Sequence, residues 1–250
     1  WSHGWAWMGR EGVVMSPKLY IMLLTYTNDP DGPRAAYAQR TLTTVLDRLS
    51  YSGPISVHIA DDGSPEPHVA RLVEIAGGYS KVQGVTATNA NRAGYGASYN
   101  LATQVVHQHA SLVLPLEDDW ELVHDLDLDH YAHALVECAP IGCVRMGYLG
   151  YTQPLRGELH TCADRRYLLF DPDSLEHHVA AGHPRLETVT WERSVGPWVE
   201  GLDPGTTEWE WCGRPAARSG VAWPMDTPLS GWFAHIGTIQ ARTDQMEVVG

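Results

Sequence analysis

The chain has 250 residues, of which 44% are hydrophobic, and this composition is sufficient for one α/β domain with a sizeable core. Its 30 acidic and 17 basic residues give a formal charge of −13. Binding along a phosphate backbone needs many Lys and Arg contacts, so this charge disfavours a general nucleic-acid binder, although a local basic patch is compatible with it. A small anionic ligand would need a divalent cation to bridge it to protein carboxylates.

Four cysteines lie at irregular spacings with no CxxC pair, which disfavours a zinc knuckle; they are Cys138, Cys143, Cys162 and Cys212. A chain of this size does not need a disulfide scaffold, so we expect reduced and mostly buried thiols. No apolar run approaches the roughly 20 residues of a membrane span, and no secretory signal opens the chain. The expected location is therefore the cytoplasm.

The first residues differ in character from the rest of the chain. Trp1, Trp5 and Trp7 lie among Gly and Ser without periodicity, ahead of Met15. We expect residues 1–14 to be a tag remnant or an upstream extension outside the fold. Residues 15–250 are expected to form a single domain, because no linker or internal repeat marks a second one.

From Leu19 onward, predicted strands alternate with predicted helices. Strands are expected at Leu19–Leu24, Ile55–Ile59, Val82–Thr86, Leu112–Leu114 and Cys143–Gly147. Helices are expected from Pro33 to the turn at Ser52-Gly53-Pro54, and at Pro67–Ala76, Ala97–His109 and Leu126–Cys138. This alternation predicts an α/β fold with a mainly parallel sheet flanked by helices. Most elements in residues 150–232, which are rich in Pro, Gly, Trp and His, are not assigned.

Three adjacent carboxylates, Glu117-Asp118-Asp119, come directly after a predicted buried strand. Adjacent carboxylates repel one another, so a fold that gathers them commonly supplies a cation. Glu117 and Asp119 would hold an oxygen-loving ion such as Mg²⁺ or Mn²⁺, with positions left open for diphosphate oxygens. The alternative is a solvated acidic turn, but the position at the end of a core strand favours the cation site.

A second acidic segment, Asp61-Asp62-Gly63-Ser64, ends the second predicted strand. Its carboxylates are suited to accept hydrogen bonds from a base or a ribose, although Asp-Gly-Ser is also common turn chemistry. The strand is expected to neighbour the first one, whose loop at Thr25 and Tyr26 opens at the same edge of the sheet.

A third segment, residues 91–100, is rich in Gly and Asn. Gly94 and Gly96 permit a close backbone approach to a ligand, and Arg92 is suited to meet a phosphate. A Rossmann dinucleotide loop is the rival interpretation, but that loop follows the first strand and needs a Gly or Ala where this chain has Tyr99. The chain has no P-loop sequence either.

These segments, in this order, resemble the family 2 glycosyltransferases of the GT-A fold over roughly residues 18–125. The resemblance implies a nucleotide-sugar donor of the UDP type, bound by residues 15–125, with residues 126–250 binding the acceptor. Asp61 would contact the base, and Glu117 to Asp119 would contact the ribose and the metal ion, with Asp119 as the main ligand. Glu117 replaces the first Asp of the family's DxD motif. The implied donor-binding residues are Thr25, Tyr26, Asp61, Asp62, Arg92, Gly94 and Asp118.

Residues 206–214 resemble the acceptor-side acidic motif of the same family, an ED pair followed by an Arg. In inverting members this motif supplies the general base that deprotonates the acceptor hydroxyl. Trp209 replaces the second acid, so the base is Glu208 or Glu210, and Glu208 is favoured. An exposed amphipathic helix start is the alternative. Trp209 and Trp211 would either stack against a sugar or pack in the core.

His235 lies near the end of the chain and resembles a late histidine that completes the metal site in several GT-A enzymes. A hydrogen-bonded core histidine is the alternative. His177, His178 and His183 show no metal spacing and are expected at the surface.

The predicted function is metal-dependent, inverting sugar transfer from a nucleotide-diphosphate donor to an acceptor hydroxyl, with Mn²⁺ or Mg²⁺ as cofactor. One alternative is a phage-type DNA glycosyltransferase acting on hydroxymethylated bases such as 5-hydroxymethylcytosine. It would need a basic surface, for which the candidates are Arg156, Arg165, Arg166 and Arg185. Another is a non-catalytic nucleotide-sugar or carbohydrate-binding module. A sugar nucleotidyltransferase ranks third, because its Gly-rich, Lys-containing opening loop is missing. The sequence does not indicate the acceptor or the oligomeric state.

Overall fold

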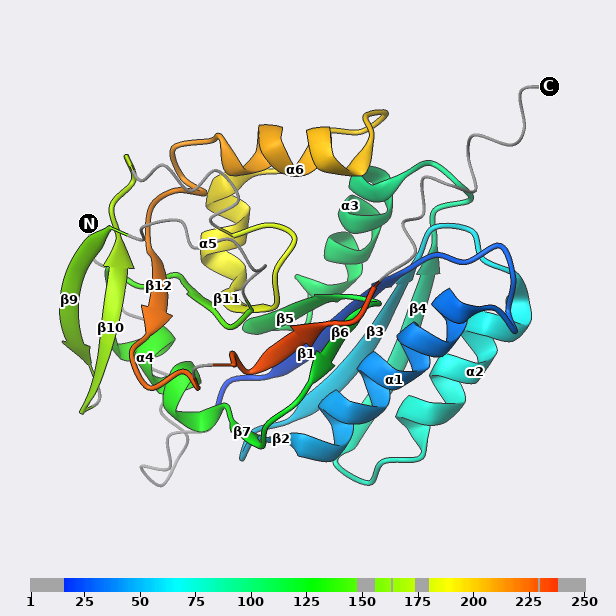
Figure 1. Ribbon diagram of the computed structural model, residues 1–250, viewed down its shortest axis with the longest axis horizontal. Coiled ribbons are helices and arrows are strands. Elements are labelled where there is room, and N and C mark those ends of the chain that lie inside the picture. Colours follow the sequence, from blue (N-terminus) through cyan, green and yellow to red (C-terminus); the bar gives the residue numbers. More distant parts are fainter. Residues whose placement is uncertain (1–15, 148–155, 163, 174–179, 229, 238–250) are drawn as a thin grey trace.

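A computed structural model describes residues 16–147, 156–162, 164–173, 180–228 and 230–237 (Figure 1). The expectations for residues 1–14 and for His177 and His178 lie outside the described residues. The elements are β1 (Leu19–Thr25), α1 (Pro33–Arg48), β2 (Leu49–Ser50), β3 (Ile55–Asp61), α2 (Glu66–Gly77), β4 (Val82–Asn89), α3 (Tyr95–Val106), β5 (Leu112–Glu117), β6 (Trp120–Leu122), β7 (Leu126–Asp127), α4 (Asp129–Glu137), β8 (Cys143–Arg145), β9 (Gly157–Cys162), β10 (Arg165–Phe170), β11 (Arg185–Thr188), α5 (Val189–Val195), α6 (Pro204–Cys212), β12 (Val221–Pro224) and β13 (Phe233–His235).

A nine-stranded sheet runs through the molecule in the order β4-β3-β1-β5-β11-β8-β12-β10-β9. The first four strands in this order are mutually parallel, as the alternation of strands and helices predicts. Beyond β5 the sheet becomes mixed, because β11 runs antiparallel to both β5 and β8. The α/β fold class is confirmed, and the registers place Thr25 beside Asp61 and Leu24 beside Glu117.

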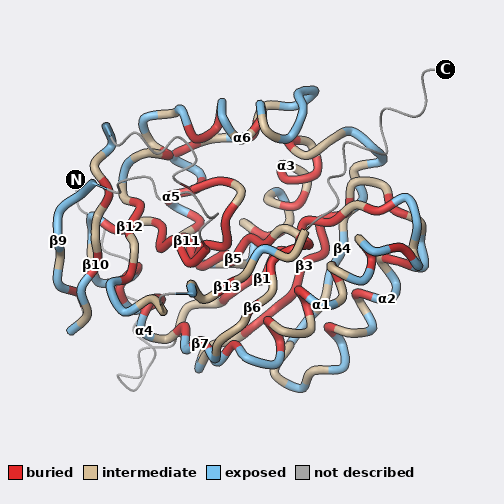
Figure 2. The backbone as a smooth tube through the Cα atoms, viewed as in Figure 1, coloured by how far each residue is buried: buried red, intermediate tan, exposed pale blue. Residues whose placement is uncertain are grey.

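Helices cover both faces of the sheet, and β1 is buried along its whole length (Figure 2). Alternate side chains of β1 pack toward opposite faces. Leu19, Ile21 and Leu23 pack into one buried cluster with residues of α1, α2 and α4. Tyr20, Met22 and Leu24 pack into the opposite cluster with residues of α3, α5 and α6. A strand buried on both faces reads as an unbroken apolar run, which explains the sequence of β1. None of the helices in the described part of the chain has the length and apolar character that a membrane crossing needs.

Several predicted boundaries shift, and two of the shifts follow from strand pairing. The helix predicted from Leu126 begins at Asp129, because Leu126–Asp127 forms β7 and pairs with β2. β4 continues to Asn89, paired with β3. α3 begins at Tyr95 rather than Ala97.

The start of α3 packs tightly against the segment that precedes α6. A Cβ atom added to Gly96 would lie 2.1 Å from the carbonyl oxygen of Val199, so this position requires glycine. Asn100 Nδ2 donates to Trp198 O at 2.9 Å, and Trp198 N donates to Asn100 Oδ1 at 2.8 Å. Gly96 and Asn100, which belong to the Gly- and Asn-rich segment, therefore hold the start of α3 against the segment before α6.

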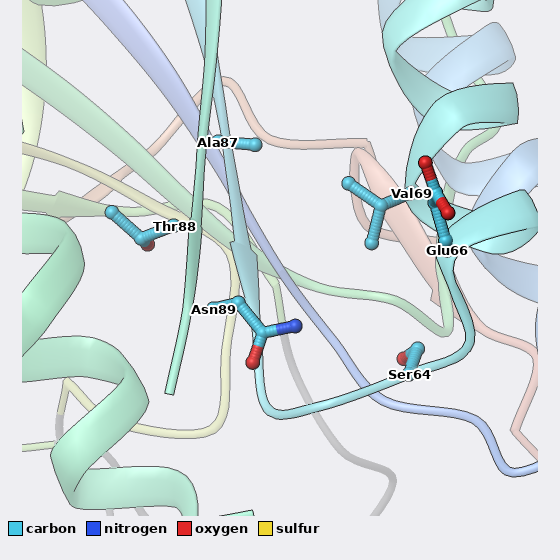
Figure 3. A pocket seen from close by; sticks show the side chains of 6 residues that line it. All are labelled: Ser64, Glu66, Val69, Ala87, Thr88 and Asn89. Atoms are coloured by element: carbon cyan, nitrogen blue, oxygen red, sulfur yellow. The ribbon is translucent and has the colours of Figure 1, made fainter. Parts of the chain in front are cut away.

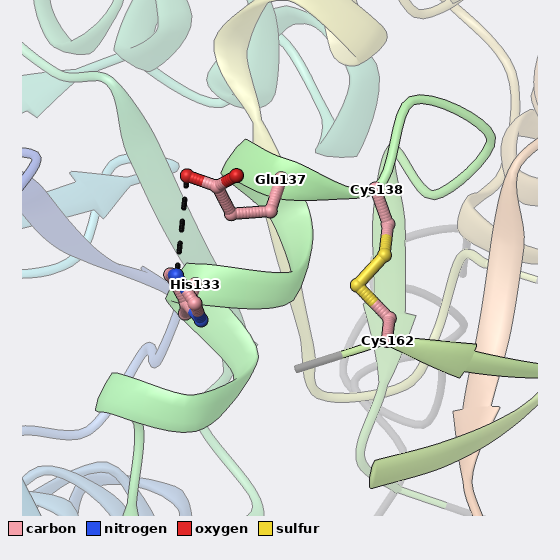
Figure 4. Close-up of a disulfide and its surroundings, with 4 residues drawn as sticks. All are labelled: His133, Glu137, Cys138 and Cys162. Carbon is pink, nitrogen blue, oxygen red and sulfur yellow. Dashed lines mark ion pairs between the residues drawn. A yellow bond between two sulfur atoms is a disulfide. The ribbon is translucent and has the colours of Figure 1, made fainter. Parts of the chain in front are cut away.

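A disulfide joins Cys138, at the C-terminus of α4, to Cys162, at the end of β9 (Figure 4). The expectation of four reduced thiols is wrong for this pair. Cys143 and Cys212 are buried free thiols, as expected. The two bonded cysteines are 24 residues apart and meet only because the fold returns β9 to the end of α4, a contact that spacing alone does not reveal.

Replacing both Cys138 and Cys162 with serine is expected to lower the free energy of unfolding by about 3 kcal/mol, because the bond restricts a loop of this length in the unfolded chain. Urea unfolding of both proteins measures the difference. As a control on the bond itself, thiol titration of the unreduced, denatured wild type should find two free thiols, and titration after reduction should find four. Four free thiols without reductant would contradict the disulfide.

Candidate active site

The acidic segments meet at the carboxyl ends of the central parallel strands. β1 ends at Thr25, β3 at Asp61 and β5 at Glu117. Their registers place these three ends next to one another. Open parallel sheets bind ligands at this edge, so the sequence correctly brings its candidate residues to one region.

Asp118 is buried, and both of its carboxylate oxygens accept hydrogen bonds from other residues of the protein. Its Oδ1 accepts a hydrogen bond from Arg34 Nη2 at 2.5 Å, and its Oδ2 accepts bonds from Thr25 Oγ1 at 2.9 Å and from Tyr26 N at 3.2 Å. Burial raises the pKa of Asp118 to about 6, although the Arg34 charge lowers it. Asp118 therefore fixes β1 and α1 to the end of β5. Arg34, which the sequence analysis missed, gives no signal beyond its place in the first turn of α1.

Asp119 and His235 lie together because β13 pairs with β6, with His235 opposite Trp120. His235 Nε2 is 3.2 Å from Asp119 Oδ2, and Ile236 N donates to Asp119 O at 2.8 Å. The hydrogen bond to Asp119 raises the pKa of His235 against the effect of burial. Asp119 Oδ1 is buried and has no hydrogen-bond partner among the described residues.

Glu117 and Glu208 come together from β5 and α6. Their carboxyl groups lie close to each other, and Tyr95 Oη donates to Glu117 Oε1 at 3.2 Å. Burial raises the pKa of Glu117 well above its usual range, and the negative charges of Glu208 and Asp119 raise it further. Both effects favour the protonated form of Glu117 over the ionised form.

The structure separates the two candidate bases on α6. Glu208 is half-buried against Glu117, whereas Glu210 is exposed. Trp209 is 48% exposed. Trp211 is buried, and its ring stacks on that of Trp198 at 4.4 Å with an interplanar angle of 4°. Trp211 therefore belongs to the core rather than to a sugar-binding surface.

The turn after β3 is organised by Asp61, which is fully buried. Its carboxylate accepts hydrogen bonds from Gly63 N at 3.0 Å, from Ser64 N at 3.0 and 3.1 Å, and from Asn89 Nδ2 at 2.9 Å. Gly63 has a φ of +95°, which favours glycine. The Asp61 carboxylate therefore stabilises the turn through these hydrogen bonds. Its neighbour Asp62 lies beside the loop that follows β4.

The loop after β4 places Gly94 beside Asp62 and Arg92 beside Tyr26. Gly94 N donates to Asp62 Oδ1 at 3.0 Å, and burial raises the pKa of Asp62. The Arg92 guanidinium lies 4.3 Å from the centre of the Tyr26 ring and donates to its hydroxyl oxygen. Tyr26, Asp62, Arg92 and Gly94 thus form one polar rim beside the ends of β1 and β3.

A cavity of about 300 Å³ lies between α2 and β4 (Figure 3). Ser64 and Asn89, which both bind Asp61, form part of its wall. A second, much smaller cavity borders the buried side of Glu117 and is lined by Tyr95, Gly182 and Arg185, among others.

Two residues expected at the surface are buried instead. His183 lies 2.9 Å from Arg145 Nη2 through its Nε2 atom. Arg185 donates to Glu187 Oε2 at 2.7 Å and to Tyr99 Oη at 2.6 Å. Arg185 belongs to β11, an inner strand of the sheet, so its charge must be paired inside the protein. It is therefore not available for the basic surface that a DNA substrate would need.

The described residues contain no group of three or more His, Cys, Asp or Glu side chains placed to hold a metal ion. Asp119 and His235 nevertheless form a pair with one unsatisfied carboxylate oxygen. Mg²⁺ is commonly bound through one or two protein carboxylates, with substrate phosphates and water supplying the remaining ligands. The pair fits such a site, whereas Glu117 Oε1 already accepts a hydrogen bond from Tyr95 Oη.

No protein-family model and no curated protein sequence matches the chain. Solved structures match its fold. TarS residues 1–349 from S. aureus, in complex with UDP-GlcNAc, align over 89% of this chain and 61% of that chain, with a TM-score of 0.61 and 12% identity. GalNAc-T7 with UDP, GalNAc and Mn²⁺ aligns over 83% of this chain and 42% of that chain, with a TM-score of 0.55 and 12% identity.

The glucosyl-3-phosphoglycerate synthase of Mycobacterium tuberculosis, in complex with Mn²⁺, UDP and glucosyl-3-phosphoglycerate, aligns over 92% of this chain and 75% of that chain. Its TM-score is 0.54 and its identity 14%. The chain spans 35% to 61% of the TarS chains that it matches. Identities this low establish the fold and leave the activity open. The chain has the GT-A fold of the nucleotide-sugar glycosyltransferases.

Proposed function

We propose that the protein is a metal-dependent, inverting glycosyltransferase that moves a sugar from a UDP-sugar donor to an acceptor hydroxyl. The observation that carries this proposal is the convergence of Glu208 with Glu117 and Asp119 at the end of β5. Glu208 comes from a part of the chain distant from Glu117 and Asp119, and the three carboxylates meet where parallel sheets bind their ligands.

On the donor side, the rim formed by Tyr26, Asp62, Arg92 and Gly94 would receive the nucleotide, and the Arg92 guanidinium is suited to the diphosphate. Asp119 and His235 would hold the metal ion. When bound, Mn²⁺ or Mg²⁺ would neutralise the charge that develops on the departing diphosphate. The ligands in the matched GT-A structures, which include UDP, UDP-GlcNAc and Mn²⁺, support this choice of donor and cofactor.

On the acceptor side, Glu208 would accept the proton of the attacking hydroxyl. The acceptor oxygen forms a bond to the anomeric carbon, the bond from that carbon to the diphosphate oxygen breaks, and UDP leaves with the electron pair. This single displacement inverts the anomeric configuration. Glu208 is the candidate base because it lies beside Glu117, whereas Glu210 is exposed.

The deciding experiment is the release of nucleoside diphosphate from a panel of UDP-, GDP- and TDP-sugars, with Mn²⁺ or Mg²⁺ and with EDTA as control. We expect metal-dependent release from a UDP-sugar, with a product of inverted configuration once an acceptor is found. Binding of donors without release, even by hydrolysis, would instead favour a non-catalytic nucleotide-sugar-binding module.

Two earlier expectations lose support. A DNA glycosyltransferase would need a basic surface, but Arg185 is buried and Arg165 is paired with Asp226. Of the four candidate arginines, Arg156 and Arg166 remain as exposed ones. The predicted cytoplasmic location is at odds with the disulfide, since disulfides persist mainly in oxidising compartments.

A further inference from the structure

A buried histidine that the proposed mechanism does not use contacts the end of β1. His68, in the first turns of α2, is 1% exposed, and its Nε2 atom lies 2.9 Å from Thr25 Oγ1. The same Thr25 oxygen is 2.9 Å from Asp118 Oδ2. One hydroxyl thus connects α2 to the carboxylate at the end of β5.

The number of protons fixes the direction of both hydrogen bonds. A threonine hydroxyl has a single hydrogen, and Thr25 donates it to Asp118. While Asp118 is ionised, Thr25 can only accept from His68, so the Nε2 atom of His68 carries a proton. Nδ1 is buried with no partner among the described residues, so it is suited to remain the unprotonated nitrogen of a neutral ring.

We propose that His68 is a positioning residue of the donor site, which acts through Thr25 on Asp118. This inference rests on the proposed function. The bond from His68 turns the Thr25 hydroxyl toward Asp118, and Asp118 then also accepts from Tyr26 N and from Arg34. One chain of contacts thereby joins α2, β1, α1 and the end of β5.

Both ends of this chain of contacts lead to residues with proposed roles. Tyr26 carries the ring that stacks with Arg92 at the nucleotide rim. Asp118 directly precedes Asp119, and its backbone oxygen accepts from Thr41 Oγ1 at 3.1 Å. Loss of the His68 proton donor would free the Thr25 hydroxyl to rotate, and the loop at Tyr26 and the turn at Asp119 would lose a shared support.

The test is calorimetric binding of UDP in the presence of Mn²⁺ to wild type, His68→Leu and His68→Gln. We expect His68→Leu to weaken binding about tenfold, which corresponds to the loss of one well-made hydrogen bond. His68→Gln, whose amide nitrogen can also donate to Thr25, should recover most of the affinity. In a Thr25→Val background, which lacks the hydroxyl, His68→Leu should have no further effect.

His58 provides a matched control. It is a buried histidine in β3, and its ring nitrogens lie 2.8 and 3.0 Å from the hydroxyls of Thr86 and Thr88. His58→Leu should disturb packing to a similar degree and leave UDP binding unchanged. If His68→Leu binds UDP no more weakly than His58→Leu, or if His68→Gln is as impaired as His68→Leu, the positioning role is overturned.

A second readout does not depend on the ligand. Nitrogen NMR of histidine-labelled protein, with the His68 signal identified by its loss in His68→Gln, should show protonated Nε2 and unprotonated Nδ1 at neutral pH. The opposite tautomer overturns the inference. A wild type that binds no nucleotide overturns the proposed function, whereas binding that is equal in wild type and His68→Leu overturns only the role of His68.

Discussion

Asp119→Ala is expected to reduce sugar transfer by about a thousandfold or more, because a metal ion commonly supplies several kcal/mol of charge stabilisation to such a reaction. The substitution removes the carboxylate that pairs with His235 and the buried Oδ1 atom that is free to meet a cation. Donor turnover and Mn²⁺ binding, measured on the same preparation, should both fall.

Asp125→Ala is the matched control for this substitution, since it removes the same charge from an exposed position shortly after β6. It should leave both quantities unchanged. Normal metal-dependent transfer by the Asp119→Ala protein would refute the assignment of the metal site to Asp119 and His235. Equal losses in the two variants would instead indicate a general effect of the protein's charge.

Glu208→Gln is expected to lower kcat by about 10²- to 10⁴-fold while the Kd for the donor changes little. The amide keeps the size of the side chain but does not accept the acceptor's proton. The substitution also removes a negative charge that raises the pKa of Glu117, so that pKa should fall. Steady-state kinetics with saturating donor, combined with direct donor binding, separates the loss of turnover from a loss of affinity.

Glu210→Gln is the control for the assignment of the base, because it makes the same chemical change on the exposed side of α6. Its kcat should match that of the wild type. A large loss in Glu210→Gln together with an active Glu208→Gln would exchange the two assignments.

The parallel half of the fold can be predicted from the sequence because each of its strands is marked by residues within or next to that strand. The apolar run of β1 and the acidic residues at the ends of β3 and β5 each report a strand and its carboxyl end. The approach of His235 to Asp119 follows from the resemblance to GT-A enzymes, and the pairing of β13 with β6 bears out their proximity.

The remaining features depend on contacts between distant segments. Nothing near Arg34 in sequence indicates that it binds Asp118, and nothing near Cys138 indicates that β9 returns to it. His183 and Arg185 look like surface residues until β11 is seen inside the sheet. Asp61 likewise appears free to meet a base, yet its own turn and Asn89 engage its oxygens.

The pairing of β13 with β6 has a consequence for the order in which the site is assembled. A ribosome makes the chain from its N-terminus, so β1, β3 and β5 are all synthesised before His235 exists. All four residues of the nucleotide rim precede β13 in the chain, and Asp119 can meet His235 only after β13 has been made. A nascent chain stalled ahead of β13 would therefore contain Asp119 without His235, which is half of the proposed metal site.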